Sequence, residues 1–211
     1  MATFLSKKGG FKPVKHINGS PYNGQSNIYT VASGQSFVPG DVVKLTGTSV
    51  NGYPEVTAAT AAASEQIVGV VVGIVNSKFD PMYGSMSTGT IVLDTPQVAN
   101  VAGQYILVAD SPDVVYSVEK AAFAATDTGA NLDISGAAGG NTVGVSNQIC
   151  GTGTTAGNFK VIGLDVTFAP LDLTVAGQWG YAQPVAGDTN VRVLVTPNAH
   201  VYAGGSGTTA V

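Results

Sequence analysis

Short, valine-rich segments separated by turn residues recur along most of this chain, and they constrain its fold more than any other feature. The turn signals include Pro39-Gly40-Asp41, Asn51-Gly52 and Ser111-Pro112-Asp113. Such segments, bounded by glycine, proline, asparagine and aspartate, are typical of β-strands, and their number favours an all-β fold. The segments are DVVKLTG (41–47), QIVGVVVGIV (66–75), GTIVLDT (89–95), GQYILVAD (103–110), VVYSVEK (114–120), FKVIGLDVTFA (159–169), GQWGYAQPV (177–185) and VRVLVTP (191–197).

The most apolar stretch, EQIVGVVVGIV at 65–75, predicts the central strand of a small β-barrel or sandwich. Gly69 and Gly73 mark where this strand can bend or approach another backbone. GQYILVADSPDVVYSVE predicts a hairpin, and VEKAAFAAT predicts one or two helical turns at most. The predicted core is Val43, Leu45, Val70, Val72, Ile74, Ile106, Val108, Val161, Ile162 and Leu164.

The chain divides into three predicted parts. Residues 1–30 contain Lys7, Lys8, Lys12 and Lys15, several glycines and no hydrophobic period, so an extended basic arm is expected there. Residues 31–98 and 99–211 predict two β subdomains, the second with a long Gly/Thr-rich loop at 126–158. Deleting residues 1–25 is therefore expected to leave a folded body. Residues 40–56 and 103–118 share a weak pattern of glycine, strand, turn and strand, which does not establish an internal repeat.

Composition favours an assembly subunit over an isolated domain. Only 10% of the residues are charged, whereas about 25% is usual. The first 40 residues hold four lysines and no acidic residue, and the remainder is acidic. A basic arm on an acidic body favours contact with an acidic surface, whereas four lysines are a thin footprint for nucleic acid.

The sequence predicts neither export nor a membrane span. MATFLSKKGG lacks the apolar region of a signal peptide, and the longest apolar run falls short of about 20 residues. We therefore expect synthesis in the cytoplasm of the host cell and no membrane partner.

Motifs that could carry chemistry are weak here. DTGA at 127–130 lacks the apolar strand that leads into an aspartic-protease aspartate, so Asp127 is interpreted as a turn residue. Asp127, Asn131 and Asp133 have the spacing of calcium ligands without the closing glutamate. The single cysteine, Cys150, excludes an intramolecular disulfide. We expect no enzyme activity, no cofactor and no metal site.

Several of these segments together resemble a known family. GDVVKLTGT, YPEVTAATAA, EQIVGVVVGI, GQYILVADSPDVVYSVE, DTGANLDI and FKVIGLDV resemble the auxiliary head proteins of tailed bacteriophages, which are capsid decoration or cement proteins. The likeness covers about residues 28–168. The first half is similar to the β-tulip domain of lambda-type decoration proteins, in which an N-terminal arm becomes ordered on the capsid and trimers form.

The resemblance implies a homotrimeric protein of the outer capsid surface that stabilises the virion by bridging subunits of the major capsid protein. The predicted capsid-binding residues are Lys7, Lys8, Phe11, Lys12, Lys15 and Tyr22, and the predicted subunit contacts are Tyr105, Tyr116 and Trp179. One alternative is a carbohydrate-binding or host-attachment module of a phage tail or fibre, because Trp179 and Tyr181 could form a sugar-stacking surface. A bacterial surface-layer subunit is disfavoured by the missing export signal.

Overall fold

The computed structural model describes residues 9–62, 65–75, 85–87, 90–92, 102–140, 144–154, 156–165 and 186–203. These residues form β-strands and one short 3₁₀ turn, η1 (Ala125–Asp127), with no α-helix among them. The predicted all-β fold with a small β-barrel is confirmed. Within the described part of the chain, no helix has the length and apolar character needed to span a membrane.

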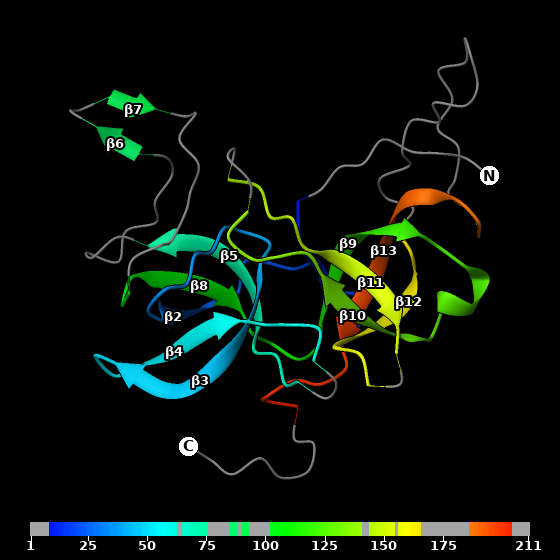
Figure 1. The fold of residues 1–211 in the computed structure, drawn as a ribbon, viewed down its shortest axis with the longest axis horizontal. Helices are drawn as coiled ribbons and strands as arrows, with labels where there is room; N and C mark the ends of the chain where they lie inside the picture. The colour runs from blue at the N-terminus through cyan, green and yellow to red at the C-terminus, as the bar shows by residue number, and fades with distance from the viewer. Residues whose placement is uncertain are drawn as a thin grey trace.

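Figure 1 shows two bodies side by side, one formed by β2–β5 and β8 and the other by β9–β13. A small hairpin of β6 and β7 stands apart from both in this view. The strands are β1 (Lys12–His16), β2 (Asn27–Val31), β3 (Val42–Val50), β4 (Tyr53–Ala58), β5 (Gly69–Val75), β6 (Ser85–Ser87), β7 (Thr90–Val92), β8 (Tyr105–Ala109), β9 (Val114–Ala122), β10 (Asn131–Ser135), β11 (Ile149–Gly153), β12 (Phe159–Leu164) and β13 (Thr189–Pro197).

The first body is a closed barrel with strand order β2-β4-β3-β5-β8. Only β2 and β4 are parallel, and the other pairs are antiparallel. Asn51 and Gly52, at φ of 53° and 82°, make the tight β3–β4 turn, because a two-residue hairpin loop of this type needs positive φ at both positions. Alternate side chains such as Val43, Ile74 and Ile106 fill the interior.

The second body is also a ring of five strands. Its sheet runs β1-β9-β11-β10-β12-β13, and a further pairing of β13 with β9 closes the ring β9-β11-β10-β12-β13. β1 and β11 both pair with β9, β1 at residues 114–117 and β11 at Lys120. β1 therefore extends the ring at one end of β9.

The two barrels have the same topology. β9 and β11 are parallel like β2 and β4, and every antiparallel pair of the first barrel has a counterpart in the second. Strands β2, β3, β4, β5 and β8 thus correspond to β9, β10, β11, β12 and β13. The chain is a structural tandem repeat of one five-stranded unit.

The pairing registers define the equivalent residues in the two barrels. The β5–β8 register shifts between Val71 and Gly73, and the β12–β13 register shifts between Val161 and Gly163. A β-bulge therefore occurs at the same place in both units. The same registers match Val43 with Leu132, Val56 with Cys150, Ile106 with Val193 and Val108 with Val195, and all eight side chains are buried.

An apolar interface joins the barrels. Val42, Val70 and Ala109 of the first barrel belong to the same buried cluster as Phe11 and Tyr116, which lie on the side of the second. Because these side chains are excluded from water by both units, neither barrel presents a complete core without the other.

Most of the predicted core is confirmed, with one exception. Leu45, Val72 and Leu164 are partly buried against the two clusters, and the other predicted residues apart from Ile162 are fully buried. Ile162 is 42% exposed. Val161 already faces the interior, and successive strand side chains point to opposite faces, so Ile162 points outward.

The structure corrects four predictions of organisation. β8 and β9 do not form a hairpin, because β8 pairs within the first barrel and β9 within the second. The boundary between the units accordingly lies at 110–113 and not at 98. The predicted loop at 126–158 contains β10 and β11, and residues 9–30 of the predicted arm contain β1 and part of β2. The predicted strand at 177–185 lies outside the described residues.

Candidate functional site

The residues predicted to form a capsid-binding arm fall into two groups. Lys7 and Lys8 lie outside the described residues. Phe11 is 1% exposed and stacks on Phe159 with ring centroids 4.5 Å apart, and its N–H donates to the Gly40 carbonyl at 2.9 Å. Phe11 is therefore a core residue, and the prediction that it is an exposed anchor is wrong.

Lys12, Lys15 and Tyr22 are held on or beside a paired strand. Lys12 lies opposite Ser117 in the β1–β9 ladder, and Lys15 follows a bulge in the same strand. Partial burial, and secondarily the charge of Arg192, lowers the pKa of Lys12. These side chains could contact a partner from a fixed strand, but they do not belong to a free arm.

The three predicted subunit-contact residues are also separated by the fold. Tyr105 is half-buried and packs edge-to-face on Tyr53, with ring centroids 5.4 Å apart. Tyr116 is fully buried, and its hydroxyl donates to the Ala109 carbonyl at 2.8 Å. Trp179 lies outside the described residues. Tyr116 is thus part of the interface between the barrels, and its predicted role in subunit contact is wrong.

Asp41 ties the start of β3 to the loop between β10 and β11. Its carboxylate accepts hydrogen bonds from Ser146 Oγ at 2.6 Å and from the backbone N–H groups of Gly139 at 2.8 Å and Val38 at 2.9 Å. Burial raises the pKa of Asp41, and these three hydrogen bonds oppose the rise. The carboxylate serves as an internal cross-link between the units.

A second charged cluster lies in the wall of the second barrel. Arg192 donates from Nε to Ser117 Oγ and from Nη2 to the Ser117 carbonyl, both at 2.8 Å. The Ser117 hydroxyl in turn donates to Asp165. Burial lowers the pKa of Arg192, and the charges of Asp165 and Glu119 oppose this shift. The cluster satisfies its own charges within the fold.

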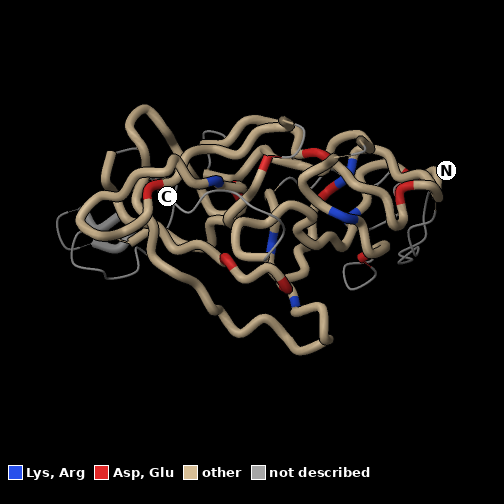
Figure 2. The backbone as a smooth tube through the Cα atoms, turned by 90° about the horizontal axis from the view of Figure 1, so that it is seen from below, with Lys and Arg blue, Asp and Glu red and all other residues tan. Residues whose placement is uncertain are grey.

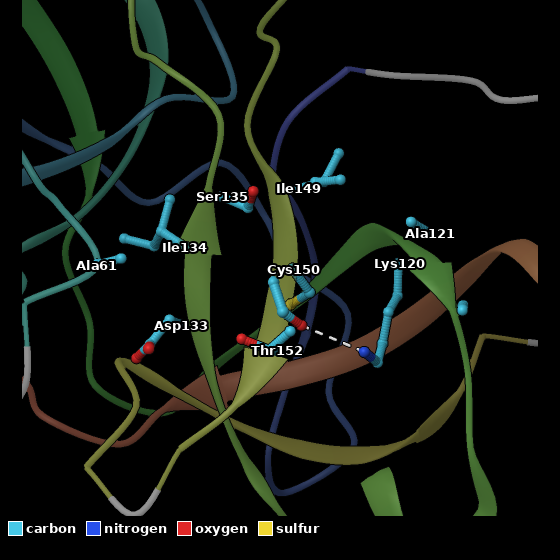
Figure 3. A pocket seen from close by; sticks show the side chains of 11 residues that line it. Ala61, Lys120, Ala121, Asp133, Ile134, Ser135, Ile149, Cys150 and Thr152 are labelled. Carbon is cyan, nitrogen blue, oxygen red and sulfur yellow. Dashed lines mark hydrogen bonds between the residues drawn. The ribbon is translucent and has the colours of Figure 1, made fainter.

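Figure 3 shows a pocket of about 440 Å³ between β9, β10 and β11, and its lining includes Lys120 and Cys150. Lys120 Nζ donates to the Gly151 carbonyl at 3.2 Å and lies 3.6 Å from Asp127. Burial raises the pKa of Cys150 to about 12. Because the thiolate is the nucleophilic form, this cysteine is not an activated nucleophile at neutral pH.

The acidic residues of the DTGA region have separate structural partners. Asp127 Oδ2 accepts from the Ala124 N–H at 2.7 Å, and Asp133 Oδ1 accepts from Thr154 Oγ1 at 3.0 Å. The predicted turn role of Asp127 is confirmed by the Asp127 N–H, which donates to the Ala124 carbonyl at 3.0 Å. In the described ranges, no three His, Cys, Asp or Glu side chains gather as metal ligands would.

A different pocket, of about 480 Å³, opens where β2 begins and β8 ends. We call it the Asp110 pocket; it is lined by Asn27, Ile28, Tyr29, Pro54, Asp110, Ser111 and Tyr202. Asp110 accepts two hydrogen bonds from Asn27 Nδ2, at 2.9 and 3.0 Å, and one from the Tyr29 hydroxyl at 2.7 Å. The Tyr29 hydroxyl also lies 3.1 Å from that of Tyr202.

Sequence reasoning missed this pocket. Asp110 was interpreted as the end of a hairpin strand, and Tyr202 lies 173 positions after Tyr29. Only the closure of the first barrel and the return of the chain after β13 bring these residues together, so no local motif identifies them.

No protein-family model, curated protein or solved structure matches this chain. Functional inference therefore depends on the geometry described above and on the resemblance noted in the sequence.

Proposed function

We propose that this protein is a non-enzymatic structural protein of a virion. It decorates the outer surface of a tailed-phage capsid and stabilises it by bridging neighbouring subunits of the major capsid protein. One observation carries the proposal: the segments that resemble decoration proteins build most of the strands of the two barrels. They contribute β3, β4, β5, β8, β9, β10 and β12.

The rigid joining of the barrels supports a bridging role. The shared apolar cluster and the Asp41 cross-link fix the two units to each other. A preorganised body loses little conformational freedom on binding, so more of its contact free energy opposes the separation of two capsid subunits.

The low charge supports a body that partners can cover. Figure 2 shows basic and acidic residues intermixed along the chain, with long uncharged stretches between them. Covering such a surface buries few unpaired charges, each of which would be costly.

The contacts of the proposed complex follow from the positions of the predicted residues. Lys12 and Lys15 on β1, together with Lys7 and Lys8, meet acidic capsid residues, and Tyr105 contributes to a homotrimer contact. Three copies in one trimer bind multivalently, so their combined affinity exceeds that of a single contact.

Co-sedimentation with heads tests the proposal. The purified chain is expected to pellet with expanded, DNA-filled heads of the phage that encodes it and not with its tails. Removing residues 1–8 should weaken binding, and added salt should weaken it further, because exposed lysine contacts are screened. Failure to bind heads at low and moderate salt would rule out decoration.

Oligomeric state is tested separately by sedimentation velocity at micromolar concentration. Tyr105→Ala is expected to lower the trimer fraction, and Ile17→Ala, an exposed apolar change elsewhere, serves as the control. A chain that is monomeric both in solution and on the particle contradicts the trimer.

A second candidate function, a carbohydrate-binding or host-attachment module, is favoured by the Asp110 pocket. That pocket combines a carboxylate, a carboxamide and an exposed tyrosine, which is the combination expected of a sugar site.

A further inference from the structure

The Asp110 pocket has the amphipathic character that sugar rings require. Pro54 and Ile28 supply an apolar wall, and Tyr202, 50% exposed, presents an aromatic ring at the rim. Asp110 and Asn27 supply polar groups beside it. Ligand sites typically combine apolar lining with a few such polar groups.

The second barrel shows that the fold does not require this polar cluster. At the positions equivalent to Asn27 and Tyr29, it carries Tyr116 and Val118, and both are buried and belong to the core. The position equivalent to Asp110 is Pro197. The same corner of the same topology is thus built without a carboxylate, which makes Asp110 and its partners a feature of the first barrel alone.

The hydrogen-bonding capacity of the cluster extends beyond its internal contacts. A carboxylate offers about four acceptor positions, and Asp110 uses three of them for Asn27 and Tyr29. The Tyr202 hydroxyl, on a half-exposed side chain, can both donate and accept. Ligand hydroxyls at the rim would therefore find acceptors and a donor already oriented by the barrel.

We propose that the Asp110 pocket binds one neutral sugar unit of a glycan. Sugar hydroxyls donate to Asp110 and exchange hydrogen bonds with Tyr202, while the C–H face of the ring packs on the Tyr202 ring and Pro54. No Lys or Arg is among the described residues that line the pocket, and the Asp110 charge disfavours carboxylated or phosphorylated sugars. The inference rests on the second candidate function, which it makes specific, and it does not depend on capsid decoration.

Saturation-transfer NMR on the full chain tests the site with methyl glycosides of glucose, galactose, mannose and N-acetylglucosamine as probes. At least one neutral probe is expected to receive saturation, and N-acetylneuraminic acid is expected to receive less. Tyr202→Ala removes the ring contact, and Asp110→Asn removes a charge-assisted hydrogen bond. Each variant should therefore weaken binding by about tenfold or more. Tyr202→Phe, which keeps the aromatic ring, should weaken probe binding less than Tyr202→Ala does.

Asp133→Asn is the matched control, because it makes the same chemical change at a part-exposed carboxylate of the second barrel. It should leave probe binding unchanged. The inference is overturned if no neutral probe receives saturation, or if Tyr202→Ala, shown to be folded by thermal melting, binds like the unaltered chain. Head co-sedimentation of Tyr202→Ala should match the unaltered chain, so failure of the sugar site and failure of capsid decoration give different results.

Discussion

Phe11 stacks on Phe159 with ring centroids 4.5 Å apart, and Tyr116 packs edge-to-face on the same Phe159 ring at 6.1 Å. The three aromatic rings come from the N-terminal segment, β12 and β9, and they lie in the cluster that joins the barrels. The N-terminal segment is thus fastened to the body at its first described residues.

Removing the Phe11 ring should lower the stability of the fold. Phe11→Ala is expected to lower the free energy of unfolding by about 3–5 kcal/mol, because it leaves a cavity among buried aromatic rings. Ile17→Ala, 65% exposed in the same segment, should change it by less than about 0.5 kcal/mol. Urea denaturation measures the free energy of unfolding of both variants. Deleting residues 1–25 should likewise destabilise the body, contrary to the expectation from sequence, whereas deleting 1–8 should not. Equal urea midpoints for Phe11→Ala and the unaltered chain would contradict the packing.

The Asp41 cross-link gives a second prediction. Asp41→Ala leaves the buried donors of Val38 and Ser146 and the part-buried donor of Gly139 without their acceptor, so the free energy of unfolding should fall by more than about 3 kcal/mol. Asp41→Asn should be nearly as damaging, because its amide N–H₂ would face other donors. Denaturation of Asp133→Asn, expected to cost less than about 1 kcal/mol, supplies the comparison. A small loss for Asp41→Ala would mean that water replaces the carboxylate.

Gly69 and Gly163, which both lie in strands, should differ sharply in how well they tolerate substitution by alanine. A Cβ at Gly69 would lie 2.0 Å from the Ala109 carbonyl oxygen, which is backbone and cannot rotate away. A Cβ at Gly163 would have no atom within 4 Å. Gly69→Ala should therefore destabilise the chain by about 3 kcal/mol or more, and Gly163→Ala should be neutral or stabilising. Thermal melting distinguishes them, and similar melting temperatures for the two variants would refute the close approach of β5 and β8.

The strands predicted from the sequence are those whose own residues form an apolar run bounded by turn residues. β5 and β8 are continuous apolar runs between turn residues, and burial from both sides favours such runs. β1 gave no such signal because it contains Pro13 and two lysines, and its stability comes from pairing with β9 at the end of the sheet. β11 was missed because ICGTG is glycine-rich, and tertiary pairing overrides its weak propensity.

The tandem repeat was hidden for a related reason. Equivalent core positions such as Val56 and Cys150 share size and burial but not identity, so the two units agree in pattern and not in sequence. The candidate site was hidden by distance along the chain, since Asp110 and Tyr202 become neighbours of Tyr29 only after the barrel closes. Neither relationship has a local signature.

The repeat itself predicts the behaviour of Cys150. Because its counterpart is Val56, Cys150→Val should change the free energy of unfolding by less than about 1.5 kcal/mol. With its pKa raised to about 12 by burial, the native thiol should not react with a disulfide reagent at pH 8, and it should react fully in denaturant. Rapid reaction of the native chain would place Cys150 at the surface and break the equivalence.

Stability should depend on pH through His200. This side chain is buried, and its Nδ1 accepts a hydrogen bond from the Tyr202 N–H at 3.0 Å, which requires the neutral ring. Burial lowers the pKa of His200 below its usual 6.5, although the Val68 backbone and the Asp110 charge oppose the shift. Between the lowered folded-state pKa and about pH 6.5, the unfolded chain binds a proton that the folded chain does not.

The free energy of unfolding should therefore fall as the pH is lowered from about 6.5 towards the folded-state pKa, and the contribution of His200 should be complete above pH 6.5. The slope from this one group is at most about 1.4 kcal/mol per pH unit. Urea denaturation between pH 5 and 7.5 measures it, and His200→Gln, which cannot titrate, should show a flatter profile. His16→Gln is the control for the only other histidine. If His200→Gln keeps the full pH dependence of the unaltered chain, the buried neutral ring is not its source.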